Sequence, residues 1–159
     1  MTAATDQGAL RQRLLSLLAT EAAKVQDFVV VLEQERAVLG EQNVEPLFAL
    51  AERKNQLAQQ LQQMATNRSA ILGQAGLPHN REGVEALLGN PDLPGWRKFL
   101  TDAERARNLN QANGLIIADR LKHNHQALAV LLSSADQPSV YGPNGHAYAR
   151  PGSRHLGSV

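Results

Sequence analysis

Residues 108–132 read NLNQANGLIIADRLKHNHQALAVLL, and their apolar side chains recur at the three- and four-residue steps of a helix. These apolar positions are Leu109, Ile116, Ile117, Leu121, Leu128 and Leu131. Four other positions on the same face are not apolar, namely Asn110, Asn113, Gly114 and Asn124. A helix that served only core packing would more often have Leu or Ala there. The stretch therefore predicts a long packed helix with polar positions inside its packed face.

Two earlier segments carry cleaner stripes of the same kind. In the first segment the positions are Leu15, Leu18, Ala22, Val25, Val29, Leu32, Arg36 and Leu39. In the second they are Leu47, Leu50, Lys54, Leu57, Leu61, Met64, Arg68, Ile71 and Ala75. Steps that alternate between three and four residues over this length are typical of a coiled-coil seam.

Capping residues, glycines and prolines mark where the helices end. Asn43 and Asn80 can cap helices, and Gly40, Gly76 and Gly89 can end them. We expect helices at about 6–39, 43–75, 80–88 and 94–134. The short connection at 40–42 makes the first two helices antiparallel neighbours. The predicted fold is all-α: an elongated antiparallel bundle of three long helices plus one short crossover helix, with coiled-coil-like packing, over residues 1–135.

The two clean stripes also predict a register. If Leu39 lies opposite Leu47, then Lys54 falls near Glu33 and Glu35, and Arg68 falls near Glu21. Ion pairs of this kind set the register of two helices more than they stabilise them.

The last residues, 136–159, differ in composition from the rest of the chain. They read DQPSVYGPNGHAYARPGSRHLGSV and are rich in Gly, Pro and Ser, so we expect an irregular tail that buries no core. Tyr141 could fold back onto the bundle, or it could be an aromatic anchor for a partner. Both interpretations remain open.

Composition excludes several classes of protein. The chain has 159 residues, with 16 Lys and Arg against 15 Asp and Glu, and this balance argues against nucleic-acid binding. The absence of cysteine excludes disulfides and Cys-ligated zinc. No apolar segment approaches the ~20 residues that span a bilayer, and no signal-peptide pattern is visible. We therefore expect a cytoplasmic protein without membrane insertion.

The sequence offers little for catalysis. His123 and His125 are two residues apart, so they lie on opposite sides of a helix and cannot hold one metal ion together. The paired acidic residues lie among basic ones and are most simply solvated charges. No Gly-x-Ser-x-Gly or phosphate-loop pattern occurs. We expect no enzyme activity, no metal site and no cofactor.

The polar positions at 108–132 have two compatible explanations. Asn110 and Asn113 could fix the register by hydrogen bonding across helices, while Gly114 could permit a close helix crossing. Alternatively, this end of the bundle is loosely packed, so that a partner helix can enter a groove.

The order of these features resembles the FlgN family of flagellar type III export chaperones. Two long Leu-rich helices come first, followed by a break with Trp96, then Asn-x-x-Asn-Gly-Leu-Ile-Ile, then Tyr-Gly-Pro-Asn-Gly. The resemblance covers about residues 10–145. Its sharpest parts are Asn110, Asn113, Gly114, Leu115 and Ile116 in the helix, and Tyr141 and Gly145 in the tail.

The resemblance implies a cytoplasmic, non-enzymatic chaperone for protein transport in bacterial flagellum biogenesis. Such a protein binds hook–filament junction proteins by their terminal helical segments and delivers them to components of the flagellar export apparatus. The partner-binding residues would be Asn113 and Tyr141 from the motifs, and Ile117, Leu121, Leu128 and Leu131 from the stripe. The alternative is a self-associating coiled-coil structural adaptor that has no client.

Overall fold

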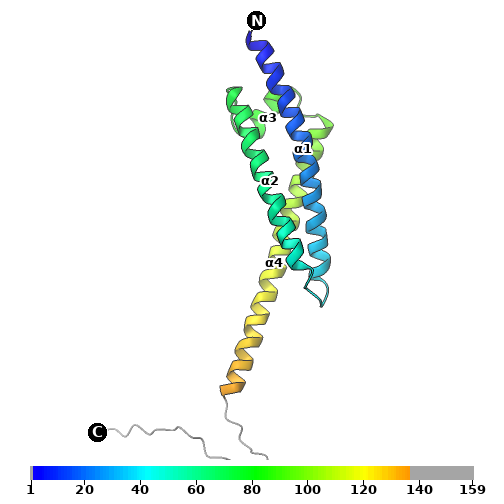
Figure 1. Ribbon diagram of the computed structural model, residues 1–159, viewed down its shortest axis with the longest axis vertical. Helices are drawn as coiled ribbons and strands as arrows, with labels where there is room; N and C mark the ends of the chain where they lie inside the picture. Colours follow the sequence, from blue (N-terminus) through cyan, green and yellow to red (C-terminus); the bar gives the residue numbers. More distant parts are fainter. Residues whose placement is uncertain (1, 137–159) are drawn as a thin grey trace, which may run out of the picture. The chain divides into compact units, whose positions relative to one another are not determined.

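The computed structural model describes residues 2–136, and the regular secondary structure within that range is helical. It contains α1 (Thr2–Leu39), α2 (Leu47–Gln74), α3 (Arg81–Leu88) and α4 (Pro94–Asp136), with no strand among the described residues (Figure 1). The predicted all-α class, with three long helices and one short one, is confirmed. The predicted tail lies outside the described residues.

The chain divides into two compact units, and the boundary lies within α4. The first unit ends at Ile117, and the second begins at Ala118. The first unit therefore contains α1, α2, α3 and the beginning of α4, while the described part of the second unit is the remainder of α4.

In the first unit, α1 and α2 run side by side in opposite directions (Figure 1). Their apolar stripes meet α3 and the first residues of α4 in one core. Its buried members are Leu14, Leu18, Val25, Ile71, Leu72, Val84, Leu87, Leu88, Trp96 and Phe99. Each fully buried Leu or Phe contributes roughly 1.5–3 kcal/mol, so this cluster is the main source of stability in the unit.

A smaller cluster joins α4 directly to α1. Ala106 of α4 packs against Val29 and Leu32 of α1, with Phe28 and Leu109 at its edge. The stripe of α4 is therefore buried along this stretch of the helix.

The predicted register between α1 and α2 is confirmed. Lys54 Nζ lies 3.1 Å from Glu35 Oε2, and Arg68 is paired with Glu21. Lys54 does not pair with Glu33, which instead binds Arg105 of α4. The Glu35 and Glu21 side chains are only 4% and 5% exposed, so both carboxylates lie inside the seam rather than at the surface.

The helix boundaries follow local hydrogen bonding. As predicted, Asn80 caps α3, because its Oδ1 accepts a hydrogen bond from the Gly83 amide at 3.0 Å. α2 begins at Leu47 rather than near Asn43. The Asn43 side chain accepts from the Glu45 amide at 3.1 Å, and this local turn replaces the helical cap that we expected there.

Gly83 is required by close packing of the backbone. A Cβ atom at this position would lie 1.8 Å from the carbonyl oxygen of Pro78. Only glycine lets the start of α3 approach the preceding loop so closely.

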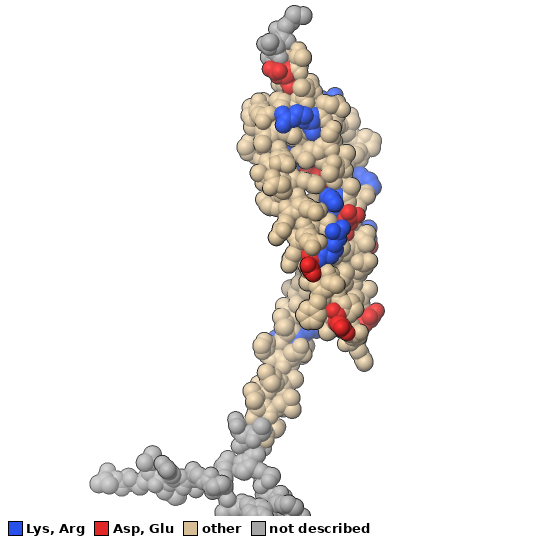
Figure 2. Space-filling model, in the orientation of Figure 1, with Lys and Arg blue, Asp and Glu red and all other residues tan. Residues whose placement is uncertain are grey.

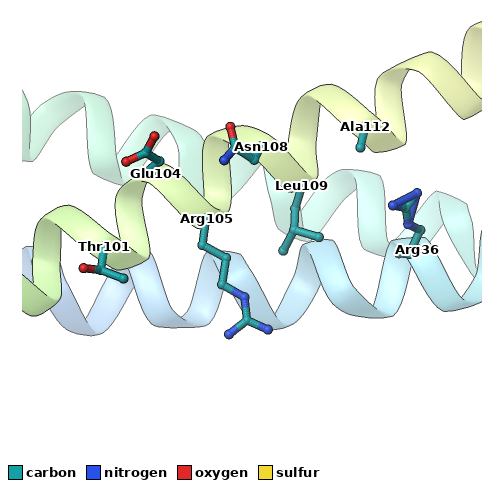
Figure 3. Close-up of a pocket in the computed structure, with 7 residues that line it drawn as sticks. All are labelled: Arg36, Thr101, Glu104, Arg105, Asn108, Leu109 and Ala112. Carbon is teal, nitrogen blue, oxygen red and sulfur yellow. The ribbon is translucent and has the colours of Figure 1, made fainter.

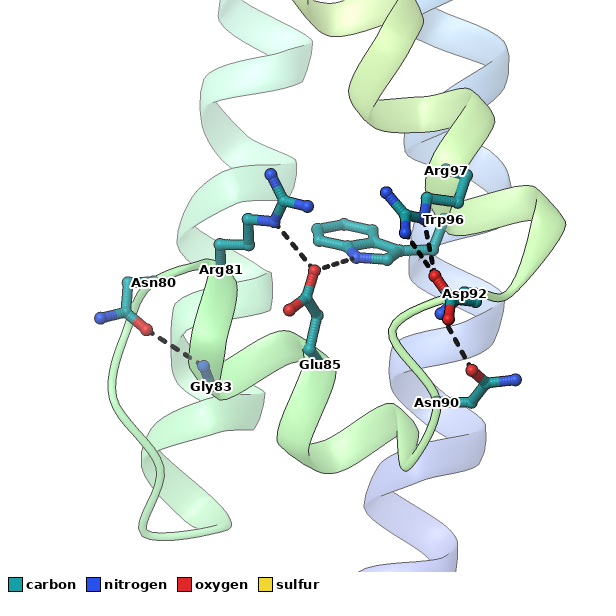
Figure 4. A network of polar contacts seen from close by, with 8 residues as sticks. All are labelled: Asn80, Arg81, Gly83, Glu85, Asn90, Asp92, Trp96 and Arg97. Carbon is teal, nitrogen blue, oxygen red and sulfur yellow. Dashed lines mark hydrogen bonds and ion pairs between the residues drawn. The ribbon is translucent and has the colours of Figure 1, made fainter.

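A polar network joins α3 to the beginning of α4 (Figure 4). Glu85 Oε1 accepts from Trp96 Nε1 at 3.0 Å and from Arg81 Nε at 2.8 Å. The hydrogen bond from Trp96, and secondarily the one from Arg81, lowers the pKa of Glu85. The Trp96 ring also stacks on Phe99, with ring centroids 5.5 Å apart. The crossover is thus held by both apolar and polar contacts.

Candidate functional site

The second unit presents an exposed apolar surface on α4. We call it the α4 apolar stripe and define it by four leucines whose spacing places them on one side of the helix: Leu121, Leu128, Leu131 and Leu132. These side chains are 53–66% exposed. A row of solvent-exposed leucines at helical spacing forms a surface on which the apolar face of a partner helix can pack.

The predicted partner-binding residues therefore fall into three groups. Leu121, Leu128 and Leu131 belong to the exposed α4 apolar stripe, while Ile117 is half-buried just before it. Asn113 is buried, as described below. Tyr141 lies outside the described residues. Leu132 was not among the predicted partner-binding residues, although its position four residues after Leu128 places it on the same side of the helix.

Asn113 lies at a point where three helices meet. It is fully buried, and its Nδ2 donates to the backbone oxygen of Leu32 at 2.9 Å and to Glu35 Oε1 at 3.0 Å. Glu35 also accepts from Lys54 of α2 at 3.1 and 3.3 Å. The cluster of Asn113, Glu35 and Lys54 thus links α4, α1 and α2. The interpretation of Asn113 as a residue that hydrogen bonds across helices is confirmed, and in this conformation its side chain is not accessible to a partner.

Two buried acceptors in the seam have no hydrogen-bond partner among the described residues. They are Oδ1 of Asn113 and Oε2 of Glu21. A buried polar atom without a hydrogen-bond partner reduces the stability of the fold. A buried polar atom that has a partner restricts the alignments in which the helices can pack. These polar groups therefore favour one specific alignment of the helices over maximal stability.

The helix-packing roles expected for Asn110 and Gly114 are not found in the described part of the chain. Both residues are exposed. No heavy atom of a described residue outside the local helix backbone lies within 4 Å of a Cβ atom placed at Gly114. Of the three positions Asn110, Asn113 and Gly114, Asn113 is buried in the bundle and the other two are exposed.

An open groove of about 550 Å³ runs between α1 and α4 in the first unit (Figure 3). Its lining residues are Arg36, Thr101, Glu104, Arg105, Asn108, Leu109 and Ala112. Arg105 is paired with Glu33, which lies outside this lining. Among the described residues, no group of three His, Asp or Glu side chains is arranged to hold a metal ion. The groove offers scattered polar contacts rather than a set of converging catalytic groups.

Comparison with known proteins assigns the chain to a family. The model of the family described as FlgN protein matches residues 1–149. The chain belongs to the FlgN family. The resemblance inferred from the motifs is thereby confirmed over almost the whole sequence.

Relatives of the FlgN-family chain carry the name flagella synthesis protein FlgN. The protein from Yersinia enterocolitica is 28% identical over 138 residues, which cover 86% of this chain and 90% of the relative. The protein from Escherichia coli K12 is 26% identical over 135 residues, covering 84% and 88%. A further Yersinia enterocolitica protein is 48% identical over 52 residues, covering 33% and 35%. No solved structure gave a significant match.

The FlgN-family assignment connects the chain to the synthesis of flagella. Within the part of the chain that the structure describes, no helix combines the length and the apolar character needed to cross a membrane. The surface that stands out on this flagellar protein is the α4 apolar stripe, because four large apolar side chains there lie open to solvent.

Proposed function

We propose that this FlgN-family chain is a cytoplasmic chaperone that binds hook–filament junction proteins and delivers them to the flagellar export apparatus. The observation that carries the proposal is the exposed α4 apolar stripe in a member of a family of flagella synthesis proteins. No catalytic step is required for this role. The chaperone binds the terminal helical segment of its client through this stripe.

The proposed binding is strong enough to be specific and weak enough to be reversible. An unbound client segment exposes apolar helical faces that would associate with one another, and the stripe would cover one of them. Each buried CH₂ group contributes roughly 0.8 kcal/mol. Ordering the client segment opposes part of that gain, so the client can be released at the export apparatus.

The contact residues in this proposal are Leu121, Leu128, Leu131 and Leu132, with Ile117 at the edge and Tyr141 contributing from the tail. In this proposal Asn113 is a positioning residue, and it is not one of the contact residues. Because it is buried and bonded to α1, it holds the first part of α4 in the bundle and affects clients only through that position.

The alternative function is a self-associating structural adaptor without a client. The same exposed stripe favours it, because two copies could cover each other's leucines. Sedimentation of the purified chain separates the two proposals. The chaperone is not expected to form a tight oligomer at micromolar concentration, whereas the adaptor is, and that oligomer should dissociate when the stripe is altered.

Calorimetric titration of a purified hook–filament junction protein into the Leu128→Ser/Leu131→Ser variant tests the chaperone proposal. We expect at least about a tenfold loss of affinity, since two buried leucines are removed from the contact. The control is Val130→Ser, because Val130 is 65% exposed but its position in the helix points away from the stripe. Circular dichroism should show unchanged helicity in both variants. Equal affinity of the double variant and the original chain would overturn the proposal.

A further inference from the structure

We propose that the client segment is an amphipathic helix with acidic residues beside its apolar face, at the end that lies against residues 120–125 of α4. This inference rests on the proposed function and specifies the chemistry of the partner. It is carried by the distribution of charge around and along the α4 apolar stripe.

The charges beside the stripe are of one sign. Residues 118–134 contain two basic residues, Arg120 and Lys122, and two histidines, His123 and His125. Asp119 is the one acidic residue in this range, and its Oδ2 lies 3.4 Å from Nδ1 of His123. Figure 2 shows no acidic side chain on the face of this segment that it draws.

Helical spacing places the acid on the side of α4 away from the leucines, although Asp119 is also a helical neighbour of Lys122, three residues later. At 3.6 residues per turn, Asp119 and its neighbour His123 lie on the side of α4 away from the leucines. Arg120 lies along one edge of the stripe, while Lys122 and His125 lie along the other. A helix that docks on the leucines therefore meets cationic or ionisable side chains on both edges.

The charge is also confined to one end of the stripe. Residues 126–134 read QALAVLLSS and carry no charge, so Leu128, Leu131 and Leu132 have neutral neighbours. A client with basic residues opposite 120–125 would place like charges together. A wholly apolar client would partly desolvate the Lys122 ammonium group without offering it a carboxylate. A client with carboxylates at that end and apolar residues beyond it matches both parts of the stripe.

An anionic membrane surface is a different binding partner that cationic amphipathic helices can recognise. Electrostatic binding to such a surface normally uses a cluster of about four to eight Lys and Arg residues. Residues 118–134 contain two. The two basic residues in this segment therefore match a few carboxylates on one protein helix better than they match an anionic membrane surface.

The test uses the full chain and a purified hook–filament junction protein, titrated at about 50 mM and about 500 mM NaCl. Lys122→Glu reverses a charge beside the stripe without altering any leucine. At low salt we expect it to weaken client binding about three- to tenfold, as expected when an exposed attraction becomes a repulsion. The difference should shrink at high salt, because salt screens exposed charges.

Arg53→Glu is the matched control, since it makes the same change in net charge at an exposed position on α2. It should leave client binding unchanged at both salt concentrations. If Lys122→Glu binds client as tightly as Arg53→Glu, the acidic-helix inference is overturned while the chaperone proposal stands. If the original chain binds no client at all, the chaperone proposal fails, and the inference that rests on it fails too.

Vesicles of phosphatidylcholine with about 30% phosphatidylserine form the final arm of the test. Under the conditions in which client binding depends on Lys122, the inference predicts that the original chain and Lys122→Glu bind the vesicles equally. Binding of the chain to these vesicles, lost in Lys122→Glu while client binding is retained, would reassign the basic edge to a membrane surface and overturn the inference.

Discussion

The side chain of Asn113 joins α4 to the other two long helices through one amide group. Its donor reaches both the Leu32 carbonyl and Glu35, and Glu35 in turn holds Lys54. An apolar residue could fill the same volume, but it would leave the buried carboxylate with one donor fewer. At the scale of single residues, polar complementarity thus determines where α4 lies along α1.

Replacement of Asn113 by Ala should therefore destabilise the bundle. We expect a loss of about 1–3 kcal/mol in the free energy of unfolding, because Leu32 O and Glu35 lose a buried donor. Urea unfolding followed by circular dichroism measures this difference. The control is Asn110→Ala on the exposed side of the same helix, where the change should stay within about 0.5 kcal/mol. Equal effects of the two substitutions would contradict the role given to Asn113.

Two glycines should respond to alanine in opposite directions. Gly83→Ala places a Cβ atom against the Pro78 carbonyl, so we expect it to reduce stability by more than about 2 kcal/mol. Gly114→Ala meets no neighbouring atom of the described residues and should raise stability by about 0.5–1 kcal/mol through helix propensity alone. Thermal unfolding of both variants checks this, and destabilisation by Gly114→Ala would show that the residue has a close contact after all.

At the scale of helices, the helical spacing of apolar residues in the α4 sequence occurs in two different environments. In the first unit Ala106 and Asn113 on this helix are buried, whereas in the second unit the leucines of the α4 apolar stripe are exposed. The period of the pattern is the same in both places. Packing holds the first stretch of α4, and our proposal assigns partner binding to the exposed second stretch.

The junction between α3 and α4 should make stability sensitive to acid. Hydrogen bonds from Trp96 and Arg81 lower the pKa of Glu85 in the folded chain, so their stabilisation is complete above the ordinary glutamate pKa of 4.5. It is lost as the pH falls through the lowered pKa of the folded state. Thermal unfolding between pH 7 and pH 3 should show a shallower decline in Glu85→Gln than in the original chain. An identical decline in both would remove Glu85 from this role.

The sequence predicted the helices and their register because period, caps and charge pairs are local or pairwise signals. Asn80, Lys54 and Arg68 all act as their positions indicated. The exposure of the stripe was not predictable residue by residue, because a pattern identifies a face but does not show which part of it another helix covers. The same reason applies to Gly114. Its cost to the helix predicted a close helix crossing, but no side chain or backbone of another described element lies against it.

At the scale of the whole molecule, our proposal assigns stability and partner binding to different residues. The first unit buries a leucine-rich core and pairs its internal charges, while the second exposes leucines beside cationic and histidine side chains. Substitutions in the exposed stripe should therefore alter binding without altering the fold. Substitutions in the polar cluster should lower stability and change binding only indirectly. This separation allows each proposal to be tested by variants that remain folded.

Amide hydrogen exchange, measured by mass spectrometry with and without a purified hook–filament junction protein, tests the central claim most directly. The proposal predicts that the client slows exchange in residues 118–134, because a docked helix covers the α4 apolar stripe and stabilises the helix beneath it. Exchange in α1 and α2 should change little. Protection confined to the first unit, or no protection anywhere at saturating client, would contradict the proposal that the end of α4 binds clients.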